Sequence, residues 1–386
     1  MFLGLLLATG ACSDDNSAST ADAALSNVDA SVSQGADAPR IDAGTSDAGA
    51  AGDDAGTAQP IQATPGTWTW VDFLDSSCDD GSPTGIGVNL STTSSNVFIY
   101  LEGGGACATY DTCVASPTYS QGPFGKTQFD TRAASLTGVL DRAHTATPMH
   151  DWNLVYVPYC TGDVHSGNNV ATYTSGSNSV VIHHVGHANV LAYLRRLAVT
   201  FPNPPKLVVS GSSAGGYGAT GNYFAIREAL APGKSYLIDD SGPSFHDEPT
   251  SNLLLGIYQA QWHLHEGIAA ICDVPCTTDL SALYTALSTR YPSDRLALLS
   301  SLQDAVIRMF LLGMPADTFQ TNLLDLGSAI FDPTSNFKYF FVAGDTHTML
   351  GHPEDFTSNS KNLDDWLSSE INDGADWVSE KPAPTP

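Results

Sequence analysis

Short apolar segments alternate with helix-like segments along most of this chain, and the alternation limits the folds that it can adopt. The apolar segments are residues 96–101, 152–157, 206–210, 235–238, 296–302 and 337–342. Segments this short and this apolar are typical of buried strands, whereas residues 188–200 have the apolar spacing of a helix. Strands separated by helices favour a mostly parallel sheet that is covered on both faces. The sequence therefore predicts an α/β fold, with room for an inserted helical cap.

Composition supports a core and excludes one class of partner. Of the 386 residues, 42% are hydrophobic and 9% aromatic, which is enough to build a large buried core. The formal net charge is −26, so the clustered Lys and Arg that bind phosphate backbones are missing. We expect no nucleic-acid partner. No apolar run reaches the ~18 residues of a membrane-spanning helix.

The first sixty residues differ from the rest. Residues 1–12 hold a short apolar stretch that ends in Gly10, Ala11 and Cys12, which is typical of an export signal and resembles a bacterial lipoprotein site. A plain secretory signal is the alternative. Residues 13–62 are rich in Ala, Asp and Gly and cannot bury enough surface to fold, so they predict a disordered tether. One domain is expected over residues 63–386. The predicted location is extracytoplasmic, either secreted or held at the outer membrane or cell surface by a lipid on Cys12.

Six further cysteines stand behind this export signal, and an even number favours three disulfides over free thiols. Six cysteines allow fifteen pairings. Cys107 and Cys113 are close enough in sequence to pair, as are Cys272 and Cys276, which leaves Cys78 with Cys160. Zinc is the competing interpretation of Cys272 and Cys276, but no second pair stands at a suitable spacing. We expect no metal.

The segment Gly211-Ser212-Ser213-Ala214-Gly215 fits the pattern G-x-S-x-G between a strand and a helix. Small residues around Ser213 permit the strained turn that lifts a serine hydroxyl out of a sheet, so Ser213 is a candidate nucleophile. The alternative is a Gly/Ser loop that matches the pattern by chance. A serine nucleophile needs a base and an acid, which follow later strands in α/β-hydrolases.

His347 follows the last predicted strand and is the candidate base; His352 is expected to be exposed. Asp304 stands at the end of the strand 296–302 and is the candidate acid. Asp345 is its rival, although an acid two residues from the base would reach the ring poorly.

The third requirement is a set of donors for an oxyanion. Residues 102–105 read Glu-Gly-Gly-Gly directly after the strand 96–101, and glycines leave backbone N–H groups unobstructed. A phosphate loop is the alternative, but the Lys and Ser/Thr that it needs do not follow.

Several motifs, which occur in the same order along the chain as in the family, resemble the pectin acetylesterase/Notum family. They are Leu-Glu-Gly-Gly-Gly-Ala-Cys at 101–107, Pro-Tyr-Cys-Thr-Gly-Asp-Val-His-Ser-Gly at 158–167, Gly-Ser-Ser-Ala-Gly-Gly at 211–216, and Asp-Ser-Gly at 240–242. Trp-Thr-Trp-Val at 68–71 and Cys-Asp-Asp-Gly-Ser-Pro-Thr-Gly at 78–85 resemble it as well. The resemblance implies an α/β-hydrolase-like fold and a triad of Ser213, Asp304 and His347. It also implies oxyanion donors at Gly104, Gly105 and Ala214, and the pairs Cys78–Cys160 and Cys107–Cys113.

The resulting function is a carboxylic-ester hydrolase that needs no cofactor and works as a monomer. Its expected substrate is an acetylated extracellular polysaccharide. A lipase or protein-lipid deacylase is the alternative within the same fold, and it would need an apolar acyl pocket. A non-catalytic surface binding protein is the alternative from another class. Two further groups of residues lie outside the triad. For His183, His184 and His187 we expect a packing or capping role rather than a metal site, and we expect Trp262, His263 and His265 either to line a substrate pocket or to pack in the core.

Overall fold

In the computed structural model, an eight-stranded sheet runs through the domain, and the described residues are 58–264, 271–272 and 274–383. The strand order is β1-β2-β4-β3-β7-β8-β9-β10. Six neighbouring strands, from β4 to β10, run parallel, and β2 pairs antiparallel with both β1 and β4. The strands are β1 Thr69–Ser77, β2 Pro83–Asn89, β3 Val97–Leu101, β4 Asn153–Val157, β7 Lys206–Ser212, β8 Lys234–Asp240, β9 Arg295–Ser301 and β10 Phe337–Val342.

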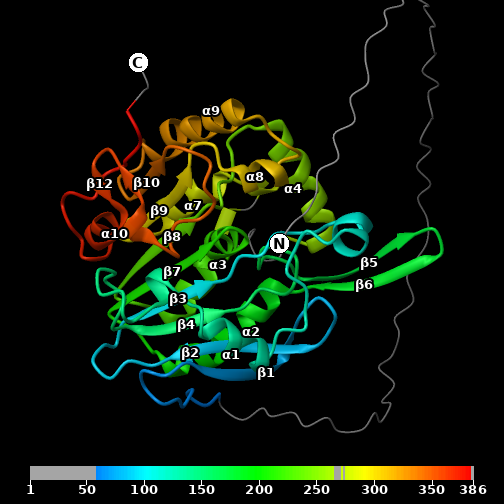
Figure 1. Cartoon of the computed structure of the whole chain (residues 1–386), viewed down its shortest axis with the longest axis horizontal. Helices are drawn as coiled ribbons and strands as arrows, with labels where there is room; N and C mark the ends of the chain where they lie inside the picture. Colours follow the sequence, from blue (N-terminus) through cyan, green and yellow to red (C-terminus); the bar gives the residue numbers. More distant parts are fainter. Residues whose placement is uncertain (1–57, 265–270, 273, 384–386) are drawn as a thin grey trace, which may run out of the picture. The chain divides into compact units, whose positions relative to one another are not determined.

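Helices cover both faces of this sheet (Figure 1). Alternate residues of one strand point to opposite faces, so Val97 and Ile99 of β3 enter one core while Phe98 enters the other. The first core also contains side chains of α2, α3, α7 and α9, and the second contains side chains of α1 and α10. These helices are α1 Lys126–Ala133, α2 Gly186–Thr200, α3 Ala214–Leu230, α7 Ala282–Arg290, α9 Ala316–Leu326 and α10 Leu363–Ile371. The α/β expectation is confirmed.

Helical segments are inserted between β8 and β9, where the sequence left room for a cap. They include α4 (Pro249–Trp262), α6 (Val274–Thr278) and α7. The short helix α8 (Ala305–Phe310) follows β9, and Figure 1 shows α4, α8 and α9 at the same end of the sheet. Parallel strands present their carboxyl ends at one edge, so these helices stand over the residues that follow the strands.

Three pairs of strands were not predicted from the sequence. Strands β1 and β2 extend the sheet; β2 carries two glycines, and a Cβ on Gly87 would lie 2.0 Å from the ring of Phe129. That glycine therefore makes room for a ring, although glycine in sequence suggests a turn. The hairpin β5 (Asn169–Ser175) and β6 (Asn178–His184) extends away from the main sheet (Figure 1). A short pair, β11 (Thr357–Ser358) and β12 (Lys361–Asn362), precedes α10.

The predicted signal, the tether and Cys12 lie outside the described residues. Within the described ranges, no helix combines the length and the hydropathy that crossing a bilayer requires.

Candidate active site

Ser213 occupies the turn between β7 and α3. Its backbone has φ 59° and ψ −123°, a conformation that non-glycine residues rarely adopt and that marks local strain. The turn is tightly packed: a Cβ on Gly211 would lie 2.2 Å from the Gly215 oxygen, and one on Gly215 would lie 2.0 Å from the Leu101 oxygen. The glycines of G-x-S-x-G are therefore required sterically, and they hold Ser213 at the carboxyl end of the parallel strands.

Asp304 and His347 meet at the same edge of the sheet. Asp304 follows β9 and is fully buried, and His347 follows β10 with its side chain 18% exposed. His347 Nδ1 lies 2.8 Å from Asp304 Oδ2. A carboxylate only accepts, so Nδ1 carries the proton and Nε2 is left with a lone pair that can accept one. In the described part of the chain, no hydrogen bond joins Ser213 Oγ to the His347 ring.

The two rival residues are placed differently. Asp345 is exposed, and its backbone oxygen accepts a hydrogen bond from Ala305. His352 is also exposed and lies 3.4 Å from Glu354. Of the two candidate acids, Asp304 is the one whose carboxylate contacts the candidate base.

In the glycine loop after β3, the carbonyl oxygens of Gly104 and Gly105 already accept hydrogen bonds, whereas their N–H groups do not donate any among the described residues. The Gly104 oxygen accepts from the Ser120 N–H at 2.7 Å, and the Gly105 oxygen accepts from the Tyr159 hydroxyl at 2.8 Å. Among the described residues, none accepts a hydrogen bond from the N–H groups of Gly104, Gly105 or Ala214. Gly105 and Ala214 border the same pocket as Ser213. All three N–H groups are therefore without an acceptor among the described residues, and Gly105 and Ala214 present theirs beside Ser213, as an oxyanion hole requires.

Glu102, the first residue of the segment Glu-Gly-Gly-Gly, anchors this loop through contacts that the sequence motif did not predict. Its carboxylate is paired with Arg132 at 2.7 Å and accepts the Tyr159 N–H at 3.1 Å. Burial raises the pKa of Glu102, and the Arg132 charge opposes that shift. The Glu102 backbone oxygen lies 2.8 Å from Nε2 of His165, whose pKa is lowered by burial. Tyr159 and His165 both belong to the family-like segment of residues 158–167, so that segment was the part of the sequence that could have indicated this network.

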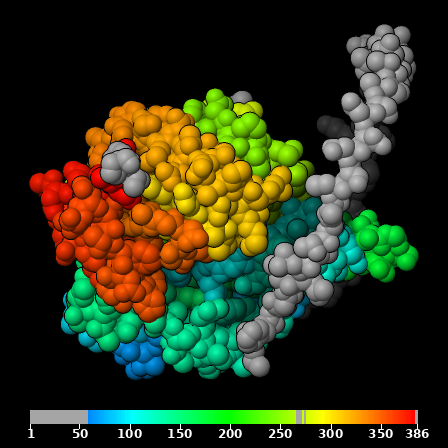
Figure 2. All heavy atoms as spheres, turned by 45° about the horizontal axis from the view of Figure 1, so that its top comes forward, coloured from blue at the N-terminus to red at the C-terminus, as the bar shows by residue number. Residues whose placement is uncertain are grey.

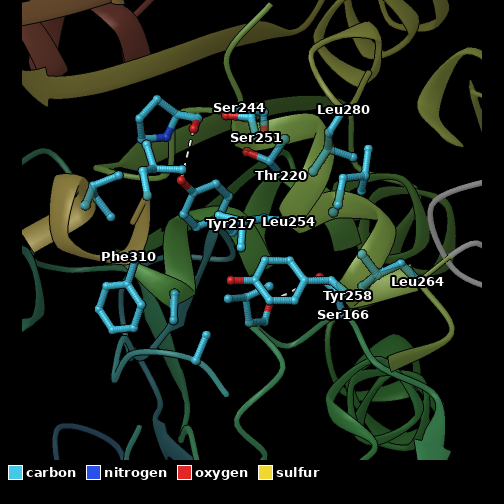
Figure 3. Close-up of a pocket in the computed structure, with 18 of the residues that line it drawn as sticks. Ser166, Tyr217, Thr220, Ser244, Ser251, Leu254, Tyr258, Leu264, Leu280 and Phe310 are labelled. Atoms are coloured by element: carbon cyan, nitrogen blue, oxygen red, sulfur yellow. Dashed lines mark hydrogen bonds between the residues drawn. The ribbon is translucent and has the colours of Figure 1, made fainter. Parts of the chain in front are cut away.

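A pocket of about 120 Å³ adjoins Ser213, and its wall is mostly apolar. A cavity of roughly 10–15 Å³ already holds one water molecule, so this pocket has room for a chain of several carbon atoms. Figure 3 shows Phe310 and Leu264 on opposite sides of it, with Tyr217, Leu254 and Tyr258 between them. Figure 2 shows the surface hollowed between the yellow segment that includes α8 and a teal segment. The apolar wall side chains include Val164, Tyr217, Phe245, Leu254, Leu255, Tyr258, Trp262, Leu264, Leu280, Leu283, Ile307, Phe310 and Leu311.

Trp262 belongs to this wall and is fully buried. Its ring stacks on Tyr258 with centroids 4.0 Å apart, and its indole N–H donates to the Cys107 oxygen at 2.9 Å. His265 lies outside the described residues. His183 and His184 are on β6, so His183 and His187 do not share a helix; His184 lies 2.9 Å from the Tyr173 hydroxyl, and His187 lies 2.7 Å from Asn222.

All six cysteines after residue 60 are paired. The disulfides are Cys78–Cys160, Cys107–Cys113 and Cys272–Cys276. Disulfides form and persist in oxidising compartments, so three of them fit an extracytoplasmic protein.

Apart from a group that contains the disulfide Cys107–Cys113, the described ranges hold one cluster of side chains that could bind a metal ion. It consists of His144, Glu354 and Asp364 and lies away from the pocket. His144 Nε2 lies 2.9 Å from Asp364 and 3.8 Å from Glu354. Neither carboxylate, nor the histidine, borders the cavity beside Ser213.

A family model, Pectinacetylesterase, matches residues 69–299. Among curated proteins, palmitoleoyl-protein carboxylesterase NOTUM of Mus musculus is 32% identical over 157 residues, which is 40% of this chain and 30% of the mouse protein. The protein of the same name from Schmidtea mediterranea is 30% identical over 156 residues, 40% of this chain and 29% of that protein. The chain thus spans about 30% of the length of these curated relatives.

The fold is shared with a solved structure. The Wnt deacylase Notum from Drosophila superimposes with a TM-score of 0.60 at 20% sequence identity, over 82% of this chain and 96% of that one. At this identity the match shows a common fold, with the candidate serine turn and glycine loop inside the segment that the family model covers.

Proposed function

Because this chain belongs to the pectinacetylesterase family, we propose that it is a serine carboxylesterase that works through an acyl-enzyme. The observation that carries the proposal is the His347–Asp304 hydrogen bond at the strand edge where Ser213 stands in its strained turn. A nucleophile, an acid and a base that follow the parallel strands β7, β9 and β10 of one sheet are the arrangement that ester hydrolysis in this fold needs.

The proposed reaction has two halves. Ser213 Oγ attacks the ester carbonyl carbon while His347 Nε2 takes the hydroxyl proton, and Asp304 stabilises the resulting imidazolium. The N–H groups of Gly104, Gly105 and Ala214 bind the oxyanion. His347 returns the proton to the leaving alcohol. Water then attacks the acyl-enzyme by the same route and releases the carboxylic acid and the free serine.

Two substrate classes follow from the sequence and from the pocket. Family membership supports removal of acetyl groups from an extracellular glycan. The apolar wall beside Ser213 favours a second candidate, an ester whose acyl group is a longer aliphatic chain, because a methyl group would leave most of about 120 Å³ unfilled. Each methylene that the pocket buries is worth about 0.8 kcal/mol, or roughly fourfold in kcat/KM.

An acyl-length series of p-nitrophenyl esters, from acetyl to dodecanoyl, tests both candidates. We expect a burst of p-nitrophenol that is absent in Ser213→Ala, and a kcat/KM that rises with each carbon until the chain fills the pocket. A maximum at acetyl would favour the glycan deacetylase. Absence of both a burst and steady-state turnover with every ester would contradict the enzyme proposal and leave a binding protein.

A matched pair of variants on α4 tests the pocket itself. Leu254 borders the pocket, whereas its neighbour Leu253 is 58% exposed. Leu254→Trp should lower kcat/KM for octanoyl esters much more than for acetyl esters, and Leu253→Trp should change neither. If Leu254→Trp affected both esters equally, the acyl chain would have to bind elsewhere.

We also propose that the protein is held at the outer membrane or cell surface by a lipid on Cys12, with the residues up to 62 as its tether. The three disulfides support the extracytoplasmic part of this proposal. Mass spectrometry of the amino-terminal peptide from the native host tests the rest: an acylated Cys12 is expected, and an unmodified mature end at another residue would contradict the anchor.

A further inference from the structure

A second buried aspartate, Asp240, joins the turn that carries Ser213 to the loop that carries His347. Asp240 is the last residue of β8 and is fully buried. Its Oδ2 accepts the Ser212 hydroxyl at 2.7 Å, and its carboxylate accepts the N–H groups of Met349 at 2.9 and 3.0 Å and of Leu350 at 3.0 Å. Its backbone oxygen accepts the Ser213 N–H at 2.7 Å.

The backbone on both sides of this link is strained. Ser213, Ser241 and Thr348 all have φ between 59° and 68° without being glycine. The Thr348 N–H lies 3.3 Å from the Ser241 hydroxyl. Strained conformations persist only where surrounding contacts fix them, and they concentrate at functional sites. Asp240 therefore supplies the contacts that hold the loop of His347, Met349 and Leu350 (the base loop) against the turn that carries Ser213.

The charge of Asp240 also faces the site. Burial raises its pKa, and the hydrogen bonds from Ser212, Leu350 and Met349 oppose the shift, as does the nearby His347. The other titratable groups that face it are Tyr100 of β3 and Asp239 of β8. In the described part of the chain, no Lys or Arg forms an ion pair with Asp240. A protonated His347 is therefore the cation that this carboxylate can stabilise.

We propose that Asp240 is a positioning residue for the esterase reaction: it fixes the His347 loop against the Ser213 turn and stabilises the imidazolium that forms during proton transfer. This inference rests on the proposed function. Asp304 acts on the ring by direct contact, whereas Asp240 acts through the backbone of residues 349–350 and through space. The sequence contained the motif Asp240-Ser241-Gly242 but gave no indication of which loop it contacts.

Asp239 provides a matched control. It is the same residue type, one position earlier on β8, and equally buried. Its carboxylate accepts the Thr220 hydroxyl at 2.8 Å and the Gly242 N–H at 2.9 Å, and it makes no hydrogen bond to the base loop among the described residues. Asp239→Asn and Asp240→Asn thus disturb the core alike, but only the second variant removes the charge beside the loop of His347.

The experiment measures kcat, KM and the pH profile of kcat/KM with the best p-nitrophenyl ester for the wild-type protein and the two variants. In Asp240→Asn we expect kcat to fall about 100-fold with KM little changed. We expect the acidic limb of the kcat/KM profile to move to lower pH by about one unit, because the anion that favours the protonated base is gone. In Asp239→Asn that limb should stay at its wild-type position.

An acidic limb that does not move in Asp240→Asn, or one that moves equally in both variants, would overturn the proposal. If Asp240→Asn does not fold, Ser212→Ala deletes one hydrogen bond to the carboxylate and keeps the charge. It should lower kcat about tenfold without moving the acidic limb, and a wild-type kcat in that variant would also overturn the proposal. A wild-type protein without esterase activity would instead refute the proposed function.

Discussion

Replacing Asp304 separates two roles that its carboxylate combines. Oδ2 contacts Nδ1 of His347, while Oδ1 accepts the N–H groups of Val306 and Ile307 at 2.9 and 3.0 Å and so caps α8. Asp304→Asn keeps an oxygen for the cap, and Asn and Asp are similar helix caps. We expect the free energy of unfolding to change by no more than about 0.5 kcal/mol.

The same substitution should nearly abolish catalysis. An amide N–H in place of Oδ2 would face His347 Nδ1 and favour the tautomer with the proton on Nε2, which cannot accept the Ser213 proton. The loss of kcat in a comparable triad variant is about 10⁴-fold, which corresponds to ~5.5 kcal/mol of transition-state stabilisation. Asp304→Ala should lose the same activity and, in addition, about 1–2 kcal/mol of stability, because the cap of α8 is deleted.

Urea unfolding and steady-state ester hydrolysis measure the two quantities on the same preparations. Asp345→Asn is the control, because that side chain is exposed and, among the described residues, hydrogen bonds reach Asp345 only at its backbone oxygen. It should leave both quantities close to wild type. A kcat within tenfold of wild type for Asp304→Asn, or a large loss for Asp345→Asn, would refute the assignment of the acid.

Three further predictions concern stability and substrate. Reduction of the disulfide Cys78–Cys160, which closes a loop of 82 residues, should lower the free energy of unfolding by about 4.5 kcal/mol in urea titrations; alkylatable thiols in the native, non-reduced protein would contradict the pairing. Glu370 is buried with no hydrogen-bond partner for either carboxyl oxygen in the described ranges, and burial raises its pKa well above the ordinary value. Its contribution to stability is therefore present at acidic pH and is lost as the pH rises, so Glu370→Gln should be more stable than wild type at pH 8 but not at pH 4, and a constant difference would argue against this reasoning. Residues 61–386 carry 14 Lys+Arg and 32 Asp+Glu, a net charge of −18, which repels a polyanionic glycan beyond the Debye length of ~8 Å. If glycans are the substrate, kcat/KM should be higher on acetylated xylan than on acetyl-polygalacturonate, and added salt should reduce the difference between the two values. A higher kcat/KM on the polygalacturonate at low salt would contradict the expected effect of charge repulsion.

Much of the fold was determined by the sequence alone. Strands that are buried on both faces must be continuously apolar, so the central parallel strands were recognisable without their partners. The predicted segment 337–342 coincides with β10, and the segment 206–210 lies within β7. Ser213 was recognisable for the same reason, because the steric demands of a strand–turn–helix junction are local and fix which residues can flank the serine.

The tertiary structure decided what depends on contacts between distant segments. Sequence spacing could rank Asp304 above Asp345 but could not show which carboxylate faces His347, since that depends on how β9 and β10 pair. Side chains of helices α3, α4, α7 and α8 line the apolar pocket, and none of these helices has a sequence motif that indicates a pocket-lining role. Asp240 contacts residues 349 and 350, more than a hundred positions later in the chain. Local patterns specify which elements form, whereas the direction of a buried side chain and its partner are set only when the sheet and its helices pack together.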